Sequence, residues 1–173
     1  MPSVVSLIHE LGARHAARTA VARLDWDPAS QRYRRGPETT YGALLDSSLR
    51  LADALARRGL RRGDRVACLL DNSAEMIVTE WACLLSGMLW VALNVRASAV
   101  EHAAILADST PAVLVVSPRY REMLDAPALP AGLRVVEVGP SGQWQELLAA
   151  GRPQRAAAEP APEDPVRIRY TSG

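Results

Sequence analysis

Two hydroxyl residues and a glycine, Thr171, Ser172 and Gly173, follow directly after a strand pattern. Residues 166–170 alternate apolar and basic side chains, which predicts a strand with one buried face. Hydroxyls and a glycine after a strand favour a tight turn whose backbone N–H groups hold an anion such as phosphate. The same residue types also form ordinary turns, so the preceding elements must decide. A hydrolase nucleophile at Ser172 is disfavoured, because the glycines of a nucleophile elbow do not flank it and no histidine follows it.

The histidines and cysteines do not form a pattern that binds metal. His9, His15 and His102 are scattered, and none pairs with another histidine or a cysteine at a ligand spacing. Cys68 and Cys83 each lie in an apolar run, which favours reduced thiols in the core over a disulfide or a ligand pair. We therefore expect no metal ligand in this chain.

Composition and charge describe a folded protein of one domain. The 173 residues are 49% hydrophobic and 23% charged, with a formal net charge of +1. This balance excludes a broad electrostatic surface for nucleic acid. Glu10, Arg14 and Arg18 interrupt the first residues before a signal-like apolar run develops, and no apolar stretch approaches the ~20 residues of a transmembrane segment. The expected location is cytoplasmic.

A helix and a peripheral hairpin are predicted before residue 40. Ser3 is placed to cap a helix over residues 3–18. Its expected apolar face consists of Val4, Leu7, Ile8 and Leu11. Residues 20–26 and 31–39 read as two strands joined by a turn.

Helices and strands alternate from residue 41 onward. The expected helices span residues 41–58, 74–86, 99–106, 118–124 and 143–150, and the expected strands span 65–70, 89–93, 112–116, 133–138 and 166–170. Such alternation requires crossover connections, so it predicts an α/β fold with a mostly parallel sheet and helices on both faces. Ligands of such sheets bind beyond the carboxyl ends of the strands, which is where Thr171 to Gly173 would lie.

Two helix starts carry capping signals. Ser98 and Glu101 have the spacing of a capping box. Asn72 and Ser73 are rival caps for the helix over residues 74–86, and Asn72 has Glu75 at the capping-box spacing. That helix is apolar on most sides, so we expect it to be deeply covered.

Seven segments of the chain, in order, resemble the amino-terminal part of the adenylate-forming (AMP-binding) enzymes. These are the acyl- and aryl-CoA synthetases, the luciferases and the adenylation domains of peptide synthetases. The matching segments are Thr40–Leu45, Leu51–Leu55, Gly63–Ala67, Asn72–Ser73, Gly87, Leu93–Asn94 and Tyr170–Gly173. The resemblance covers nearly the whole chain and implies a flavodoxin- or Rossmann-like subdomain of the family's large domain.

The resemblance also implies a chemistry. Such enzymes use ATP and Mg²⁺ to convert a small carboxylic acid into an acyl-adenylate and pyrophosphate, and then transfer the acyl group to a thiol, with CoA the expected acceptor. The family's phosphate loop reads Tyr-Thr-Ser-Gly-Thr-Thr-Gly, so Thr171, Ser172 and Gly173 are assigned to ATP binding. The catalytic and metal-binding residues of the family lie in regions that have no counterpart here, so no catalytic residue is expected.

We therefore expect residues 1–173 to be a single partial domain, with residues 151–165 as an exposed connector rich in Pro and Ala. The expected function is that of a fragment of an acid–CoA ligase, with fatty acid metabolism as one setting, and inactive as the isolated chain. The acid itself is left open among fatty, aromatic and amino acids. The alternative is a non-enzymatic module that uses the α/β body for protein association. In either case, apolar surface left by the missing half of the domain would favour a homo-oligomer.

Overall fold

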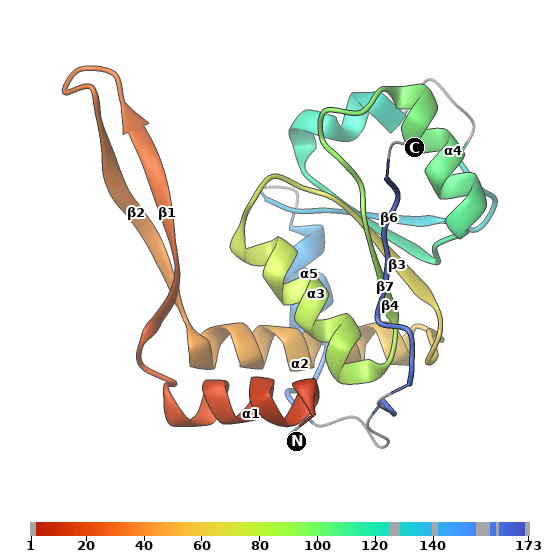
Figure 1. Cartoon of the computed structure of the whole chain (residues 1–173), viewed down its shortest axis with the longest axis horizontal. Coiled ribbons are helices and arrows are strands. Elements are labelled where there is room, and N and C mark those ends of the chain that lie inside the picture. Colours follow the sequence, from red (N-terminus) through yellow and green to blue (C-terminus); the bar gives the residue numbers. More distant parts are fainter. Residues whose placement is uncertain (1–2, 125–128, 140–141, 155–159, 162, 172–173) are drawn as a thin grey trace.

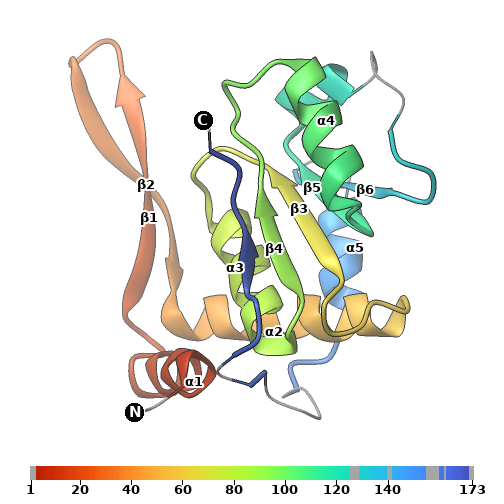
Figure 2. The same ribbon diagram turned by 45° about the vertical axis from the view of Figure 1, so that its right-hand side comes forward.

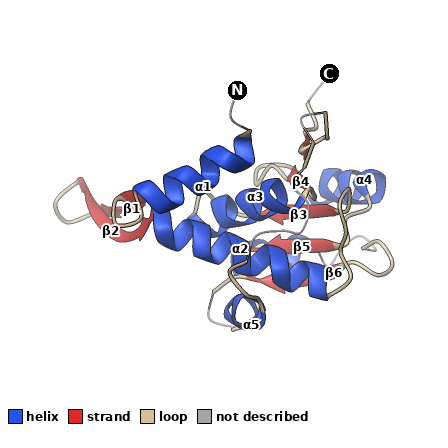
Figure 3. Ribbon diagram, turned by 90° about the horizontal axis from the view of Figure 1, so that it is seen from below, coloured by secondary structure: helices blue, strands red, loops and turns tan. Residues whose placement is uncertain are grey.

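The computed structural model describes residues 3–124, 129–139, 142–154, 160–161 and 163–171. Two substructures are visible: a hairpin that projects from one end, and an α/β body (Figure 1). Seen from below, the hairpin lies at the end of the molecule away from helix α4 (Figure 3). The predicted α/β class with a parallel sheet is confirmed.

The hairpin consists of β1 (Thr19–Asp27) and β2 (Arg32–Thr40), which pair antiparallel. Helix α1 (Val4–Arg14) precedes it, and helix α2 (Tyr41–Arg57) follows directly from β2. The Thr40 hydroxyl caps α2 by accepting the Ala43 N–H at 3.2 Å. The hairpin therefore rises from the end at which α2 begins.

The predicted apolar face of α1 is partly wrong. Val5, Ile8 and Gly12 are buried, whereas Val4 and Leu7 are exposed. Val5 and Ile8 pack with Leu49 of α2 and with Leu85. The helix lies across two other helices rather than on a sheet, and this placement rotates its buried face by about one residue.

Five parallel strands form the sheet of the body. They are β3 (Arg65–Leu69), β4 (Leu89–Ala92), β5 (Val113–Val116), β6 (Arg134–Glu137) and β7 (Arg167–Ile168). Their spatial order is β6-β5-β3-β4-β7, so β6 and β7 are the two edges. The connection after β3 leads to one side of that strand, and the connection after β4 returns across it to β5. The order of strands in the sheet is therefore not their order in the chain.

Helices cover both faces of the sheet, as predicted. On one face, α2, α3 (Ala74–Ser86) and α5 (Gln143–Ala150) pack on side chains such as Val66, Cys68 and Val115. On the other face, α4 (Ala99–Ser109) and the 3-10 helix η1 (Pro118–Leu124) pack on Ala67, Val91 and their neighbours. Figure 1 shows α3 and α4 on opposite sides of the strands.

The helix caps settle the open alternatives. Ser73, not Asn72, caps α3, because its hydroxyl accepts the Met76 N–H at 3.3 Å. The capping box of Ser98 and Glu101 is present at the start of α4. Helix α3 is less covered than predicted: Val78, Ala82, Cys83 and Leu85 are buried, but Met76, Ile77, Trp81 and Leu84 are half-buried.

Candidate functional site

The predicted site lies at the exit of edge strand β7. This strand pairs with β4 through two register positions, Trp90 with Arg167 and Val91 with Ile168. Both strands run in the same direction, and the chain leaves β7 at the carboxyl end of the sheet, toward which β3 and β4 also point (Figure 2). Thr171 is exposed there, beyond the carboxyl end of the strand. Ser172 and Gly173 lie outside the described residues, so their assignment stays a prediction.

An ion pair anchors the first residue of β7 on the α3 side of the sheet. The Arg167 guanidinium pairs with the Glu80 carboxylate of α3, and it also lies over the Trp90 ring at 4.8 Å from the centroid. Cation and ring attract each other through the ring quadrupole, and the carboxylate neutralises the charge. The start of the strand is therefore fixed from this side.

A second contact holds the other end of the strand on the α4 side. The Tyr170 hydroxyl donates to Oδ2 of Asp108, in the last turn of α4, at 2.5 Å. Ile168 and the Tyr170 ring pack against the apolar cluster that contains Leu106 and Val91. Burial raises the pKa of the Tyr170 phenol, and the hydrogen bond to the Asp108 carboxylate raises it further. Tyr170 is thus a protonated donor, one residue before Thr171.

A pocket of about 390 Å³ lies between α3, the end of β4 and β7. It is lined by Met76, Glu80, Trp90, Ala92, Leu93, Asn94 and residues 167–170. Within the part of the chain that the structure describes, Arg169 is exposed and forms no ion pair, whereas Arg167 is paired with Glu80. An exposed arginine two positions before an exposed threonine supplies donor types that suit an anionic ligand.

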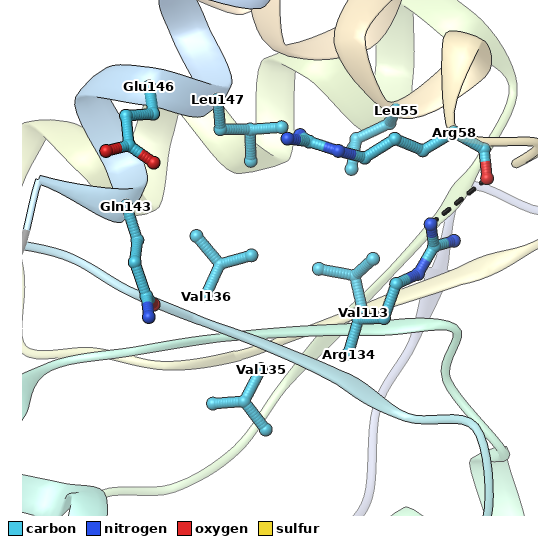
Figure 4. Close-up of a pocket in the computed structure, with 9 residues that line it drawn as sticks. All are labelled: Leu55, Arg58, Val113, Arg134, Val135, Val136, Gln143, Glu146 and Leu147. Atoms are coloured by element: carbon cyan, nitrogen blue, oxygen red, sulfur yellow. Dashed lines mark hydrogen bonds between the residues drawn. The ribbon is translucent and has the colours of Figure 1, made fainter.

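A second, smaller cavity lies at the opposite edge of the sheet (Figure 4). Its volume is about 270 Å³, and its floor is formed by the aliphatic side chains of α2, α5, β5 and β6. Arg58, Arg134, Gln143 and Glu146 stand at its rim, and Nη1 of Arg134 donates to the Arg58 carbonyl oxygen at 3.1 Å. Strand β6 is the far edge from β7, so this cavity is separate from the Thr171 site.

The described residues form neither a metal-binding cluster nor a transmembrane helix. No group of three or more His, Cys, Asp or Glu side chains there is arranged to hold a metal ion. No helix among them is long and apolar enough to cross a bilayer.

Comparison with known proteins decides the family. The family model described as AMP-binding enzyme matches residues 9–173. The chain belongs to the AMP-binding enzyme family. A similar relative is the indoleacetate–CoA ligase of Aromatoleum aromaticum, which is 36% identical over 142 residues; the match covers 79% of this chain and 28% of the relative. The chain thus spans less than a third of the length of such curated relatives.

Solved AMP-binding enzymes share the fold. The anthranilate CoA ligase AuaEII in complex with anthranoyl-AMP matches 98% of this chain with 31% of its own, at a TM-score of 0.82 and 23% identity. The inhibitor-bound N-terminal domain of FACL13 from Mycobacterium tuberculosis matches the whole chain with 42% of its own, at a TM-score of 0.81 and 25% identity. The predicted resemblance to adenylate-forming enzymes is therefore confirmed for family and fold.

The sequence analysis proposed Thr171 as a site residue but did not identify the side chains that contact the strand before it. Glu80 and Asp108 lie on α3 and α4, 87 and 62 positions away from the β7 residues that they contact. Nothing in their local sequence marks them, because each is a single acidic residue within a helix. Only the packing of α3 and α4 on the two faces of the sheet brings them to β7.

Proposed function

We propose that this chain is the part of an ATP-dependent acid–CoA ligase that supplies the first residues of the nucleotide phosphate loop. The observation that carries the proposal is the match of the AMP-binding enzyme model over residues 9–173, together with the exposed Thr171 at the carboxyl end of β7. The CoA ligase among its relatives supports CoA as the acceptor. The substrate is a carboxylic acid of the fatty, aromatic or amino acid class.

The reaction that we propose has two steps. A carboxylate oxygen of the acid attacks the α-phosphorus of ATP; the new O–P bond forms as the P–O bond to pyrophosphate breaks, which gives acyl-adenylate and pyrophosphate. The CoA sulfur then attacks the acyl carbonyl carbon and releases AMP. Mg²⁺, when bound, neutralises charge on the phosphates.

Residues of this chain contribute binding rather than bond making. The Thr171 hydroxyl and the N–H groups of the loop are donors for phosphate oxygens, and such donors stabilise developing negative charge without reorganising. Arg169, exposed and without an acidic partner in the described part of the chain, adds positive charge beside them. Arg167, by contrast, forms an ion pair with Glu80, so its charge stabilises the position of β7 and is not available to phosphate.

Acid-dependent exchange of labelled pyrophosphate into ATP tests this proposal. The protein as its gene encodes it would be assayed against a panel of an arylacetic acid, a benzoic acid, a long-chain fatty acid and an amino acid. We expect exchange with at least one acid, and a weakening of about tenfold or more for Thr171→Val, which keeps the shape and removes the hydroxyl. Absence of exchange and of acyl-CoA formation with every acid class would overturn the assignment.

We further propose that the polypeptide of residues 1–173, purified alone, does not form acyl-adenylate and binds neither ATP nor CoA tightly. Its share of 28% of the indoleacetate–CoA ligase supports this, because adenylation needs positioned cations and donors around the whole nucleotide. Measurable exchange by this polypeptide would contradict the proposal. Its proposed setting is the cytoplasm.

One observation favours a second candidate, a self-association module. Leu24, Trp26 and Tyr33 are 62%, 53% and 67% exposed, and they lie on the hairpin that projects from the body. Exposed aromatic residues on a projecting element are typical of interaction surfaces. Light scattering would show a dimer that Trp26→Ser dissociates; a monomer at all concentrations would count against this candidate.

A further inference from the structure

Among the described residues, the hydrogen bond between Tyr170 and Asp108 is the side-chain contact nearest in sequence to Thr171. Tyr170 directly precedes Thr171, and its hydroxyl reaches Oδ2 of Asp108 at 2.5 Å. Asp108 lies in the final turn of α4, whose start is closed by the Ser98 capping box. The acceptor is therefore carried by a regular helix that packs on the sheet through Leu106, which is fully buried.

The backbone of β7 provides little restraint at this point. The strand has two residues, and its ladder with β4 ends at Ile168. Tyr170 and Thr171 lie beyond the last paired position, so within the described residues the ladder with β4 does not restrain them. The direction in which the chain leaves the sheet thus depends on what holds Tyr170.

The contact on the opposite face acts earlier in the strand. Arg167 binds Glu80 and stacks on Trp90, but it lies three positions before Tyr170. It fixes where β7 enters the sheet. Asp108 fixes where the chain leaves.

We propose that Asp108 and Tyr170 are positioning residues of the nucleotide site: their hydrogen bond sets the course of the chain from β7 and so directs Thr171 toward the phosphates. The inference rests on the proposed function, since it assumes that the loop binds ATP. Neither residue is assigned contact with the substrate. Their effect passes through the backbone of the loop, so it appears in nucleotide binding before it appears in chemistry.

The test uses the gene-encoded protein and measures KM for ATP and kcat with the acid that gives the highest exchange rate. Tyr170→Phe removes one oxygen atom and keeps the ring, so the fold is retained. We expect it to raise KM for ATP about tenfold with kcat changed by less than about threefold, which is the pattern of a lost contribution to binding. Asp108→Asn keeps an acceptor oxygen and should lie near the wild type, whereas Asp108→Leu of similar size should match Tyr170→Phe.

A double variant tests whether the two single changes act through one shared hydrogen bond or independently of each other. If the two residues act through one hydrogen bond, Tyr170→Phe combined with Asp108→Leu is no worse than the more affected single variant. Tyr33→Phe removes a hydroxyl from an exposed tyrosine and is the matched control, expected to change neither constant.

Two failures are distinguishable. A wild-type protein without ATP-dependent acid activation overturns the proposed function and this inference with it. An active wild type in which Tyr170→Phe behaves like Tyr33→Phe, or in which the two changes multiply, overturns the inference alone.

Discussion

His102 of α4 donates a hydrogen bond from Nε2 to the carbonyl oxygen of Asn94, at 2.8 Å, from a position with no exposed surface. A carbonyl oxygen only accepts, so Nε2 carries the proton. The other ring nitrogen, Nδ1, is buried and has no partner within the described residues. The same Asn94 carbonyl accepts the Ala97 N–H at 3.0 Å, so it closes the turn between β4 and α4. One buried side chain thus fastens the loop that borders the pocket beside Arg169.

Loss of this contact should lower the stability. His102→Ala removes a fully buried ring and the donor to Asn94, and we expect it to cost about 2–4 kcal/mol in the free energy of unfolding, measured by urea titration. Val100→Ala on the same helix, where Val100 is 77% exposed, is the control and should stay within about 0.5 kcal/mol. Equal losses in the free energy of unfolding for the two variants would mean that the His102 ring does not contribute to packing.

The capping box makes the stability of α4 depend on pH. Hydrogen bonds from the Ser98 N–H and hydroxyl to the Glu101 carboxylate lower the pKa of Glu101 from its ordinary value of 4.5. A group whose pKa is lowered by folding stabilises the protein above its unfolded pKa, and this stabilisation is lost as the pH falls through the folded value. The advantage of the wild type over Glu101→Gln should therefore be complete at pH 7 and should shrink below about pH 4.5. Chemical denaturation at a series of pH values measures it, and a difference that is independent of pH would contradict the contact.

Removal of the Ser98 hydroxyl tests the other half of the same box. Ser98 accepts the Glu101 N–H at 3.3 Å, so Ser98→Ala leaves that donor at the helix start without its side-chain acceptor. We expect a loss of about 1 kcal/mol in the free energy of unfolding. Ser98→Asp retains a capping oxygen and should keep most of the stability. If Ser98→Asp lowers the free energy of unfolding as much as Ser98→Ala does, Ser98 does not act as a helix cap.

Both cysteines should be unreactive in the folded protein. Burial raises the pKa of the Cys68 thiol to about 12, and burial likewise raises the pKa of Cys83 far above its ordinary range. Because the thiolate is the reactive form, a water-soluble thiol reagent at pH 8 should label neither in the native state and both in denaturant. Mass spectrometry counts the labels, and a label on the native protein would show that α3 opens from the sheet.

Replacing Gly151 or Gly59 with alanine should destabilise the protein, for a different physical reason at each position. A Cβ atom at Gly151 would collide with the Arg50 carbonyl, 2.7 Å from its carbon, whereas one at Gly59 meets nothing within 4 Å but stands at a φ of +91°. We expect Gly151→Ala to cost about 2–3 kcal/mol, because backbone must move, and Gly59→Ala about 1 kcal/mol, because only the turn is strained. Thermal unfolding of the two variants gives the comparison, and the reverse order would show that residues 151–154 are free to shift on α2.

The contact at Gly151 belongs to a wider attachment of the connector. The Arg50 guanidinium donates to the Gly151 carbonyl at 3.2 Å, and Asp53 accepts the Arg152 N–H and the Gln154 amide, each at 2.8 Å. Gly151 is buried, whereas residues 152–154 are exposed. At its other described end, Asp164 pairs with Arg62. The connector therefore reaches β7 after being tied to the body at two points.

Local chemistry in the sequence was sufficient for much of the fold. Ser3, Thr40 and Ser98 begin their helices as predicted, since an N-cap needs only the hydroxyl and the backbone next to it. The uninterrupted apolar run of residues 112–116 became the buried strand β5, because a strand covered on both faces has no polar face to display. The family and the place of Thr171 at the end of a strand followed from motifs in their order along the chain.

The tertiary structure decided what no window of sequence contains. Whether α1 buries Val4 or Val5 depends on which helices it packs against, because the spacing of its apolar residues is compatible with either face being buried. The contacts of Tyr170 with Asp108 and of Arg167 with Glu80 depend on the strand order, which places β7 next to β4 and beneath α4 on one face and α3 on the other. The sequence alone predicted a strand near the end of the chain, followed by two hydroxyl residues and a glycine as a candidate phosphate-binding turn. Long-range packing determined which side chains hold that strand, because its two residues are too few to hold themselves.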